Sequence, residues 1–298
     1  MLAIVIPYYK YTFFEETLKS LTNQTDKRFK VYIGDDASPE NPSDLLKKYK
    51  GKFDFVYHRF EKNLGGTSLT QQWERCIALS GNEEWIMILG DDDVLGENVV
   101  EAFYRNLEEI KLVSNVVRFA SCKIDGKGIM MSSVYHHPRL ESSVEFFFRG
   151  VRSSLSEYVF NKEKILDIGF KNFPLGWMSD VLAVLEFSNF KNVYSINEAL
   201  VYVRTSNLNI SGRQDNLKQK GKAYFCFHLY LLTQKHNFFT ELQKKELLSR
   251  ISRSFLNNKK QLGLFFEISK IYLNNFLVAD YYRFLKSIVI IIFQKECE

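Results

Sequence analysis

The sequence contains the stretch Trp85-Ile86-Met87-Ile88-Leu89-Gly90-Asp91-Asp92-Asp93-Val94-Leu95, an apolar run that ends in three consecutive carboxylates. Large apolar residues in succession, without polar alternation, predict a strand covered on both faces. Such strands occur mostly in parallel sheets flanked by helices. Ligands of these sheets bind beyond the carboxyl ends of the strands. The stretch therefore predicts an α/β fold with an acidic site at the end of a buried strand.

The three carboxylates have two interpretations. Adjacent carboxylates repel one another and lose hydration at a strand end, so a cation is expected beside them, most simply a divalent metal with oxygen ligands. Alternatively, the stretch is an acidic turn in which Asp93 caps the following helix. The acidic turn by itself is compatible with both.

Strands and helices alternate through the residues before Trp85. Apolar runs predict strands over 2–6, 29–33 and 53–58, and capping and turn signals predict helices over 12–22, from 41 onward and over 67–80. The first helix is expected to start at a capping box formed by Thr12 and Glu15. This alternation predicts a parallel, doubly wound sheet with right-handed crossovers. The loops 7–12, 34–40 and 90–96 would then lie along one edge.

Aromatic and acidic side chains would converge at that edge: Tyr8, Tyr9, Asp35, Asp36, Asp91 and Asp92. An aromatic ring stacks on a nucleobase while a nearby carboxylate accepts the N–H of the base, so Tyr9 with Asp36 predicts a nucleotide site. Alternatively, these aromatic rings only contribute to packing.

The composition is that of a soluble globular protein, with 298 residues of which 46% are hydrophobic and 25% charged. The segment before Pro7 is too short for a signal peptide, and no apolar run reaches the ~18 residues needed to span a bilayer. The four cysteines are scattered and indicate neither a zinc site nor a disulfide framework, so a cytoplasmic location is expected.

Positive charge is concentrated at the end of the chain. Residues 213–298 hold 15 Lys and Arg against 7 Asp and Glu, whereas residues 1–212 hold 25 against 28. The basic region, with helices predicted over 215–235, 240–256 and 276–293, is either a solvated surface or a contact for an anionic partner such as a membrane.

Four motifs resemble, in order and spacing, those of family 2 glycosyltransferases with the GT-A fold: Val5-Ile6-Pro7-Tyr8-Tyr9, Gly34-Asp35-Asp36-Ala37-Ser38, Asn63-Leu64-Gly65-Gly66 and Leu89-Gly90-Asp91-Asp92-Asp93. The resemblance implies a Rossmann-like, mostly parallel twisted sheet flanked by helices over residues 1–212. Residues 1–95 would bind the nucleotide sugar and residues 96–212 the acceptor. Residues 213–298 would form a helical C-terminal extension.

The resemblance also implies a donor and a metal. The donor would be a nucleotide-diphosphate sugar, with UDP-sugar the expected form, contacted by Pro7, Tyr8, Tyr9, Asp36, Asn63, Gly65, Asp91, Asp92 and Trp177. Asp91-Asp92 matches the family's DXD motif and would bind Mn²⁺ or Mg²⁺, with Asp92 as the main ligand. Gly90 stands where the longer family pattern has its first Asp.

The acceptor side of the resemblance centres on Leu175-Gly176-Trp177-Met178-Ser179-Asp180. Asp180 would be the general base of an inverting displacement, although Ser179 replaces the Glu that commonly precedes this Asp. Alternatively, Asp180 caps the helix predicted over 181–187. Trp177 would cover the donor or the acceptor, or else belong to the core.

Farther along, Arg204 stands where the family has an arginine near the diphosphate, and Ser206 replaces the histidine that commonly follows. In the C-terminal region, a sharper hypothesis places aromatic and basic side chains on a membrane surface near a lipid-linked acceptor. These residues are Phe265, Phe266, Tyr281, Tyr282 and Phe284 with Lys270, Arg283 and Lys286.

The sequence thus predicts a metal-dependent, inverting glycosyltransferase that acts on a glycan or lipid-linked acceptor, in the cytoplasm or at the inner face of the membrane. Nucleic acid is not an expected partner. The alternatives are a sugar nucleotidyltransferase and a non-catalytic scaffold. The glycine-free loop Pro7-Tyr8-Tyr9-Lys10-Tyr11 disfavours the first, because a triphosphate site calls for a glycine-rich loop. The joint presence of Asp36, Asp92 and Asp180 disfavours the second.

Overall fold

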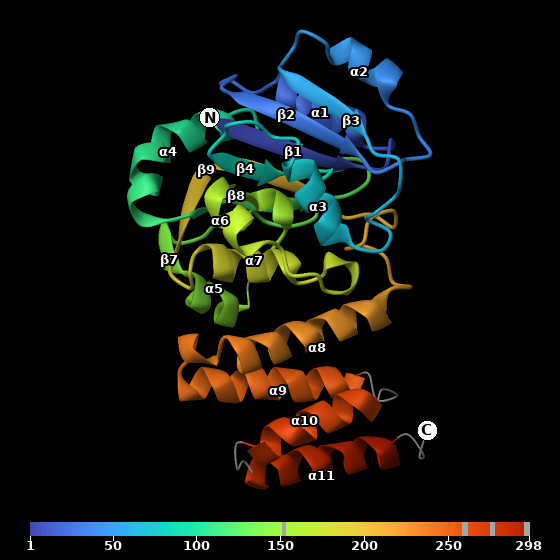
Figure 1. Cartoon of the computed structure of the whole chain (residues 1–298), viewed down its shortest axis with the longest axis vertical. Helices are drawn as coiled ribbons and strands as arrows, with labels where there is room; N and C mark the ends of the chain where they lie inside the picture. The colour runs from blue at the N-terminus through green and yellow to red at the C-terminus, as the bar shows by residue number, and fades with distance from the viewer. Residues whose placement is uncertain (151–152, 258–261, 275–277, 295–298) are drawn as a thin grey trace. The chain divides into compact units, whose positions relative to one another are not determined.

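The computed structural model describes residues 1–150, 153–257, 262–274 and 278–294. The chain forms two compact units, Met1–Gln214 and Asp215–Glu298. The first unit is built on one mixed sheet, with the strand order β3-β2-β1-β4-β8-β6-β9-β5 and β7 paired to β9 (Figure 1). The predicted α/β architecture is confirmed.

The N-terminal half of the sheet is parallel, as the alternation predicted. It contains β1 (Leu2–Tyr8), β2 (Phe29–Asp35), β3 (Phe55–Arg59) and β4 (Trp85–Ile88), and its helices are α1 (Phe14–Thr22), α2 (Ser43–Tyr49) and α3 (Leu69–Ile77). The strand order 3-2-1-4 reverses between β1 and β4. In an open α/β sheet, this switch point is where a crevice forms beyond the strand ends.

The other half of the sheet mixes strand directions. It contains β5 (Val94–Leu95), β6 (Val116–Ile124), β7 (Leu140–Ser142), β8 (Tyr158–Asn161) and β9 (Asn192–Arg204). Its helical segments are α4 (Val99–Val113), α5 (Ser143–Arg149), η1 (Leu155–Glu157), α6 (Lys162–Ile168), η2 (Pro174–Gly176) and α7 (Ser179–Phe187). β8 runs antiparallel to β4 and β6, whereas β9 is parallel to β6. Arg204 is the last residue of β9, and β7 with α5 lacked a clear sequence signal.

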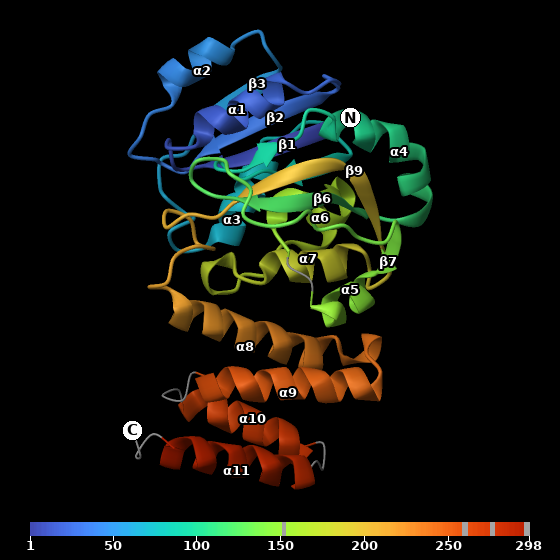
Figure 2. The same cartoon turned by 180° about the vertical axis from the view of Figure 1, so that it is seen from behind.

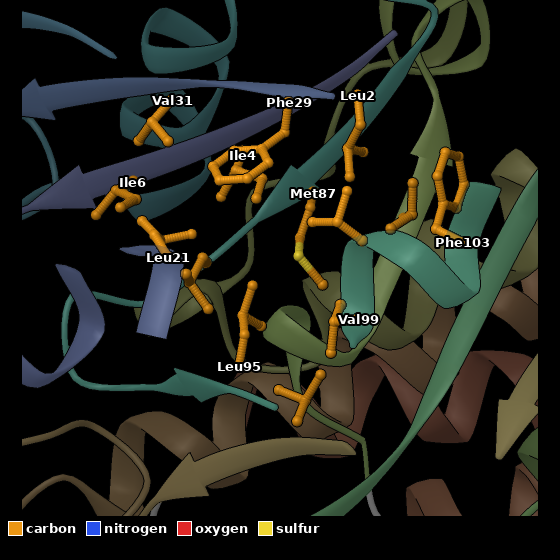
Figure 3. Packing of buried hydrophobic residues seen from close by; sticks show 14 of the residues in the cluster. Leu2, Ile4, Ile6, Leu21, Phe29, Val31, Met87, Leu95, Val99 and Phe103 are labelled. Carbon is orange, nitrogen blue, oxygen red and sulfur yellow. The ribbon is translucent and has the colours of Figure 1, made fainter. Parts of the chain in front are cut away.

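Both faces of the central strands are buried, which explains the unbroken apolar runs. Leu2, Ile4 and Ile6 of β1 pack with Met87 against α1 and α4, as Figure 3 shows. The alternate residues Ala3 and Val5 pack with the helices on the opposite face, α3, α6 and α7 (Figure 2). Successive strand residues point to opposite faces, so a strand covered on both sides has no place for polar side chains.

The predicted capping box at Thr12 is wrong. The residue at the N-cap of α1 is Phe13, and no side chain accepts a hydrogen bond there. The structure instead uses Phe13 as a ring beneath the guanidinium of Arg204, which lies 4.4 Å from the ring centroid.

The second unit consists of α8 (Leu217–Gln234), η3 (His236–Phe238), α9 (Glu241–Asn257), α10 (Leu262–Asn274) and α11 (Val278–Gln294). Its own core joins aromatic and aliphatic residues of the four α-helices, among them Phe225, Ile251, Phe255, Ile268 and Phe284. The sequence did not predict α10 as a separate helix. Within the described residues, none of the helices combines the length and apolar character needed to cross a bilayer.

Five aromatic residues of this unit were predicted to face a membrane, and the structure divides them. Phe284 is buried in the core, and Phe265 and Tyr281 pack against it, so the prediction is wrong for these three. Phe266 and Tyr282 are 67% and 68% exposed. Lys270, Arg283 and Lys286 are exposed as well.

Candidate active site

The acidic turn lies at the switch point of the sheet. The backbone N–H groups of Tyr9 and Lys10, just beyond β1, both donate to Oδ2 of Asp91, just beyond β4, at 2.7 Å. The hydroxyl of Ser38, in the loop after β2, donates to the carbonyl of Tyr9 at 2.6 Å. The three loops predicted to converge are therefore joined by hydrogen bonds.

Asp92 is held from the other side by the end of β9 and the loop that follows. Asn209 Nδ2 donates to Asp92 Oδ2 at 3.1 Å, and Arg204 Nε donates to the Asp92 carbonyl at 2.9 Å. Lys10 Nζ donates to the carbonyl of Leu208 in the same loop. Lys10 and Asn209 were not identified from the sequence, because neither belongs to a motif and only the fold brings them to this turn.

Asp93 has a structural role that differs from the helix cap considered above. Asn98, not Asp93, stands at the N-cap of α4. Asp93 is buried, and its Oδ1 accepts the backbone N–H of Arg204 at 2.8 Å while its Oδ2 accepts the hydroxyl of Ser156. Ser156 also accepts the N–H of Gly90 at 3.0 Å. Asp93 thus fixes the turn so that Asp91 and Asp92 take their positions.

Electrostatics at the turn favour a cation. Burial, and then the charge of Asp92, raises the pKa of the Asp91 carboxyl, against the lowering effect of the Lys10 and Tyr9 N–H groups. Burial likewise raises the pKa of Asp92, and the hydrogen bond from Asn209 and the charges of Lys10 and Arg204 oppose it. Two adjacent carboxylates that resist ionisation together are stabilised by a positive ion between or beside them.

The oxygen ligands present suit a cation that keeps part of its water shell. Within the part of the chain that the structure describes, no group of three or more His, Cys, Asp or Glu residues could hold a metal ion. Mg²⁺-like ions are often bound through only one or two carboxylates together with substrate phosphates. Asp91 and Asp92 therefore fit a divalent cation that arrives with a phosphorylated ligand.

Asp36 is already engaged by the protein. Its carboxylate accepts the N–H groups of Leu64 at 2.7 Å and Gly65 at 2.9 Å, and it pairs with Arg75. A Cβ at Gly65 would lie 2.6 Å from Asp36 Oδ2, so the loop needs glycine there. Asn63 closes the same loop by accepting the N–H of Gly66 at 2.6 Å. The structure brings Asp36, Asn63 and Gly65 together around this loop.

Tyr9 and Asp36, which were predicted to recognise a nucleobase together, do not contact each other. Tyr9 is 38% exposed, whereas the Asp36 side chain is 5% exposed and faces the 63–66 loop. In the described structure, no hydrogen bond or ring contact joins the two side chains. Tyr9 is left as an accessible ring next to the acidic turn.

Tyr8 was predicted to contact the donor, but the structure places it in the core. Its ring is fully buried with its centroid 4.6 Å from that of Phe14, and its hydroxyl donates to the carbonyl of Glu40 at 2.8 Å. Burial raises the pKa of the Tyr8 hydroxyl. The alternation of β1 accounts for this, because Tyr8 shares with Ile6 the face of the strand that packs against α1. Pro7, on the opposite face, is half-buried.

The segment around Asp180 has an unusual backbone. Leu175 and Met178, both non-glycine residues, have φ angles of 63° and 70°. Such conformations are costly and concentrate at functional sites. Gly176 also has a positive φ, and a Cβ there would lie 3.2 Å from Leu69 and Trp73 of α3. This packing places the segment, including the half-buried Trp177, beside the helix that follows the 63–66 loop.

Asp180 lies in the first turn of α7 and is half-buried. Ser153 Oγ donates to Asp180 Oδ2 at 3.1 Å and lies 2.9 Å from the hydroxyl of Tyr158. Ser153 precedes η1, whose Ser156 binds the acidic turn through Asp93. The 153–157 segment therefore links Asp180 to the end of β4, a connection that the sequence did not reveal.

The resemblance placed Arg204 near the diphosphate, but its side chain is directed into the protein. Its guanidinium is fully buried and donates to the carbonyls of Asp92 and Asp125, at 2.9 and 2.8 Å, and to the carboxylate of Glu16. All its nitrogens donate to oxygen atoms of the protein, so Arg204 stabilises the acidic turn from the protein interior.

Comparison with known proteins agrees with this geometry. Residues 3–164 match the model of Glycosyl transferase family 2. The chain is similar to an uncharacterized glycosyltransferase of Haemophilus influenzae, at 25% identity over 68% of this chain and 67% of that protein. It is also similar to the glycosyltransferase GlyG of Streptococcus pneumoniae, at 23% identity, but this match spans only 37% of this chain and 36% of GlyG.

Among solved structures, the chain resembles S. aureus TarS, residues 1–349, in complex with UDP-GlcNAc. The TM-score is 0.64, with 14% identity over 85% of this chain and 71% of that one. The TarS fragment with UDP gives a TM-score of 0.55 at 15% identity, over 87% of this chain and 72% of that one. The fold is thus the GT-A fold. The family model covers more than half of the residues, so the chain belongs to glycosyl transferase family 2 and is a glycosyltransferase.

Proposed function

We propose that the chain transfers a sugar from a nucleotide-diphosphate donor, UDP-linked in the first instance, to a hydroxyl of a glycan or lipid-linked acceptor. The observation that carries this proposal is the Asp91–Asp92 pair, held by the Tyr9 and Lys10 N–H groups at the switch point. The similarity to TarS, which was solved with UDP-GlcNAc and with UDP, supports a donor of this class. Tyr9 offers an exposed ring for the base, and Asp36, beyond the neighbouring strand β2, binds the 63–66 loop.

The displacement inverts the anomeric carbon, and Asp180 acts as the general base. Its carboxylate takes the proton of the acceptor hydroxyl as the oxygen attacks from the face opposite the leaving diphosphate. Ser153 orients the Asp180 carboxylate by donating to Oδ2. Trp177, three residues before Asp180, borders the sugar.

Asp92 and Asp91 would hold Mn²⁺ or Mg²⁺ together with the donor, and the ion would neutralise charge that develops on the diphosphate. The chain's own contribution is to keep this pair in place. Asn209 fixes Oδ2 of Asp92, and Arg204 fixes its backbone carbonyl. Lys10 adds a positive charge beside both carboxylates.

The second unit is proposed to bring the enzyme to the inner face of the cell membrane. The exposed rings of Phe266 and Tyr282 accompany the exposed cations Lys270, Arg283 and Lys286. Exposed aromatic rings next to cations favour the interface of an anionic bilayer. This contact uses two of the five aromatic residues suggested by the sequence.

The test is incubation with a panel of nucleotide sugars, Mn²⁺ and glycan acceptors, followed by detection of released nucleoside diphosphate and of the product's anomeric configuration. Release of UDP with an inverted product supports the proposal. Pyrophosphate formed from a nucleoside triphosphate and a sugar phosphate would identify a nucleotidyltransferase. Absence of turnover with every donor and acceptor would indicate a scaffold.

A further inference from the structure

A polar pocket lies at the edge of the sheet opposite the acidic turn. Its volume is about 700 Å³, within the range of small-molecule sites. It forms where β4 and β6 begin and β8 ends, because β8 is antiparallel to both neighbours. Trp85, the first residue of β4, lines this pocket, whereas Asp91 lies beyond the other end of the same strand. The pocket is therefore distinct from the candidate active site.

Glu83 is an unsatisfied group within this pocket's lining. The residue is 4% exposed, its Oε1 accepts the hydroxyl of Tyr32 at 2.8 Å, and its Oε2 is buried without a hydrogen-bond partner. The exposed turn at Gly81 covers Oε2, since a Cβ there would lie 3.4 Å from it. A buried carboxylate oxygen without a donor is costly, so a ligand hydroxyl that donates to it would be stabilising.

Amide side chains supply the remaining polar groups of the pocket. Asn82 and Asn115 both line it, and neither side chain makes a hydrogen bond within the described structure. Lys162 lies across the pocket, with its Nζ donating to the Gly81 carbonyl at 2.6 Å. Each amide offers donors and an acceptor at once, which suits groups that both donate and accept.

The charges of the lining disfavour anionic ligands. The lining holds Glu83, Glu84 and Glu163 together with Lys111 and Lys162, so the pocket is close to neutral. A phosphate or nucleic acid would meet more negative than positive charge. The amide groups and the near-neutral lining fit an uncharged ligand rich in hydroxyl groups.

We propose that this pocket is a second, non-catalytic saccharide site that holds the glycan acceptor or product away from the acidic turn, an inference that rests on the proposed function. Hydroxyl groups of the sugar donate to Glu83 and exchange hydrogen bonds with Asn82 and Asn115. Binding here raises the local concentration of the acceptor end at the catalytic edge.

The experiment is calorimetric titration of the full chain, without donor, with chitohexaose, maltohexaose, cellohexaose and the glycan that serves as acceptor in the transfer assay. At least one of these glycans binds. Asn82→Ala and Asn115→Ala, which remove side chains without internal hydrogen bonds, each weaken this binding at least fivefold. Asp92→Asn, at the catalytic edge, leaves it unchanged.

Two results would overturn the proposal: no binding of any of these glycans, or binding that both asparagine variants retain in full. Failure of the proposed transfer activity is a separate outcome, because it is detected by nucleotide release and not by the titration. Glycan binding lost in Asp92→Asn alone would place the saccharide in the active site and also reject the second site.

Discussion

At the scale of single residues, Asp180 is the side chain on which the proposed chemistry depends most. Its carboxylate is half-buried in the first turn of α7 and bound on one oxygen by Ser153. Asp180→Asn keeps the shape and removes the proton acceptor, so we expect kcat to fall by ~10²–10⁴-fold. Binding of UDP with Mn²⁺, measured by titration, should remain within about twofold of the wild type.

Ser153→Ala serves as the control for Asp180, since it removes the orienting hydrogen bond and keeps the base. This variant should lose less activity than Asp180→Asn. Full transfer activity in Asp180→Asn would remove Asp180 as the base and leave it as a residue of the α7 helix start.

The stability of the protein is expected to depend on pH through Asp92, because burial raises the pKa of this carboxyl and of Asp91 in the folded protein. The stabilising contribution of protonated Asp91 and Asp92 to the metal-free protein is therefore fully present below the unfolded-state pKa of ~4. This contribution is lost as pH rises through the raised folded-state pKa values, because ionisation of the pair is penalised only in the folded chain. Asp92→Asn should thus stabilise the metal-free protein by about 1 kcal/mol at pH 8 and have little effect at pH 4.

Thermal melts of wild type and variant from pH 4 to 8 measure this difference. Mn²⁺ with UDP should reverse the order at pH 8, because the variant has lost the main proposed ligand. If Asp92→Asn changes the stability by the same amount at pH 4 and pH 8, ionisation of the two adjacent carboxylates does not destabilise the folded protein.

At the scale of elements, Arg204 ties the end of β9 to α1 and to the acidic turn. Its buried guanidinium reaches Asp92, Asp125 and Glu16 at once. Arg204→Met would leave these acceptors without donors, so we expect a loss of about 3 kcal/mol in the free energy of unfolding.

Denaturant unfolding measures the Arg204 effect, with Arg105→Met as the matched control. Arg105 is an exposed arginine paired with Glu101 one helical turn away, and its removal should cost less than ~0.5 kcal/mol. Equal small losses in both variants would contradict the supporting role given to Arg204.

The prediction on membrane binding concerns the helices α10 and α11. Phe266→Ser combined with Tyr282→Ser removes two exposed rings without touching the core of the unit. We expect partition onto phosphatidylglycerol vesicles, measured by sedimentation, to fall at least ~10-fold, since burying one such ring is worth ~1.5–3 kcal/mol. Leu112→Ser, which alters an 85% exposed leucine of the first unit, is the control and should bind as the wild type. Unchanged partition in the double variant would reject this surface.

At the scale of the whole molecule, the two units have separate cores and should unfold separately. The cores of Met1–Gln214 pack its sheet and helices, and the core of the second unit joins only residues of its own helices. Calorimetry of the full chain should show two transitions. UDP with Mn²⁺ at ~100 times Kd should stabilise only one of them, by about 2.7 kcal/mol.

The variant Phe255→Ala assigns the two transitions, because it opens a cavity in the core of the second unit alone. It should lower the transition that the nucleotide leaves unmoved. A single transition, shifted as a whole by both the nucleotide and this variant, would contradict the independence of the units.

The sequence by itself determined the parallel half of the sheet and the position of the acidic turn. Unbroken apolar strands, each followed by a polar loop, carry this information locally, because strand periodicity and turn chemistry involve residues close in the chain. The resemblance of four short motifs then gave the fold and the family, both of which are confirmed.

Only the tertiary structure decided what each side chain of these motifs does. Tyr8 and Tyr9 are neighbours in the sequence, yet one ring is buried and the other exposed, because β1 ends at Tyr8 and Tyr9 lies in the loop beyond it. Arg204, Asn209 and Ser156 reach the acidic turn from distant segments. A partner more than sixty residues away leaves no local pattern, so which carboxylates are free to bind a ligand follows from packing alone.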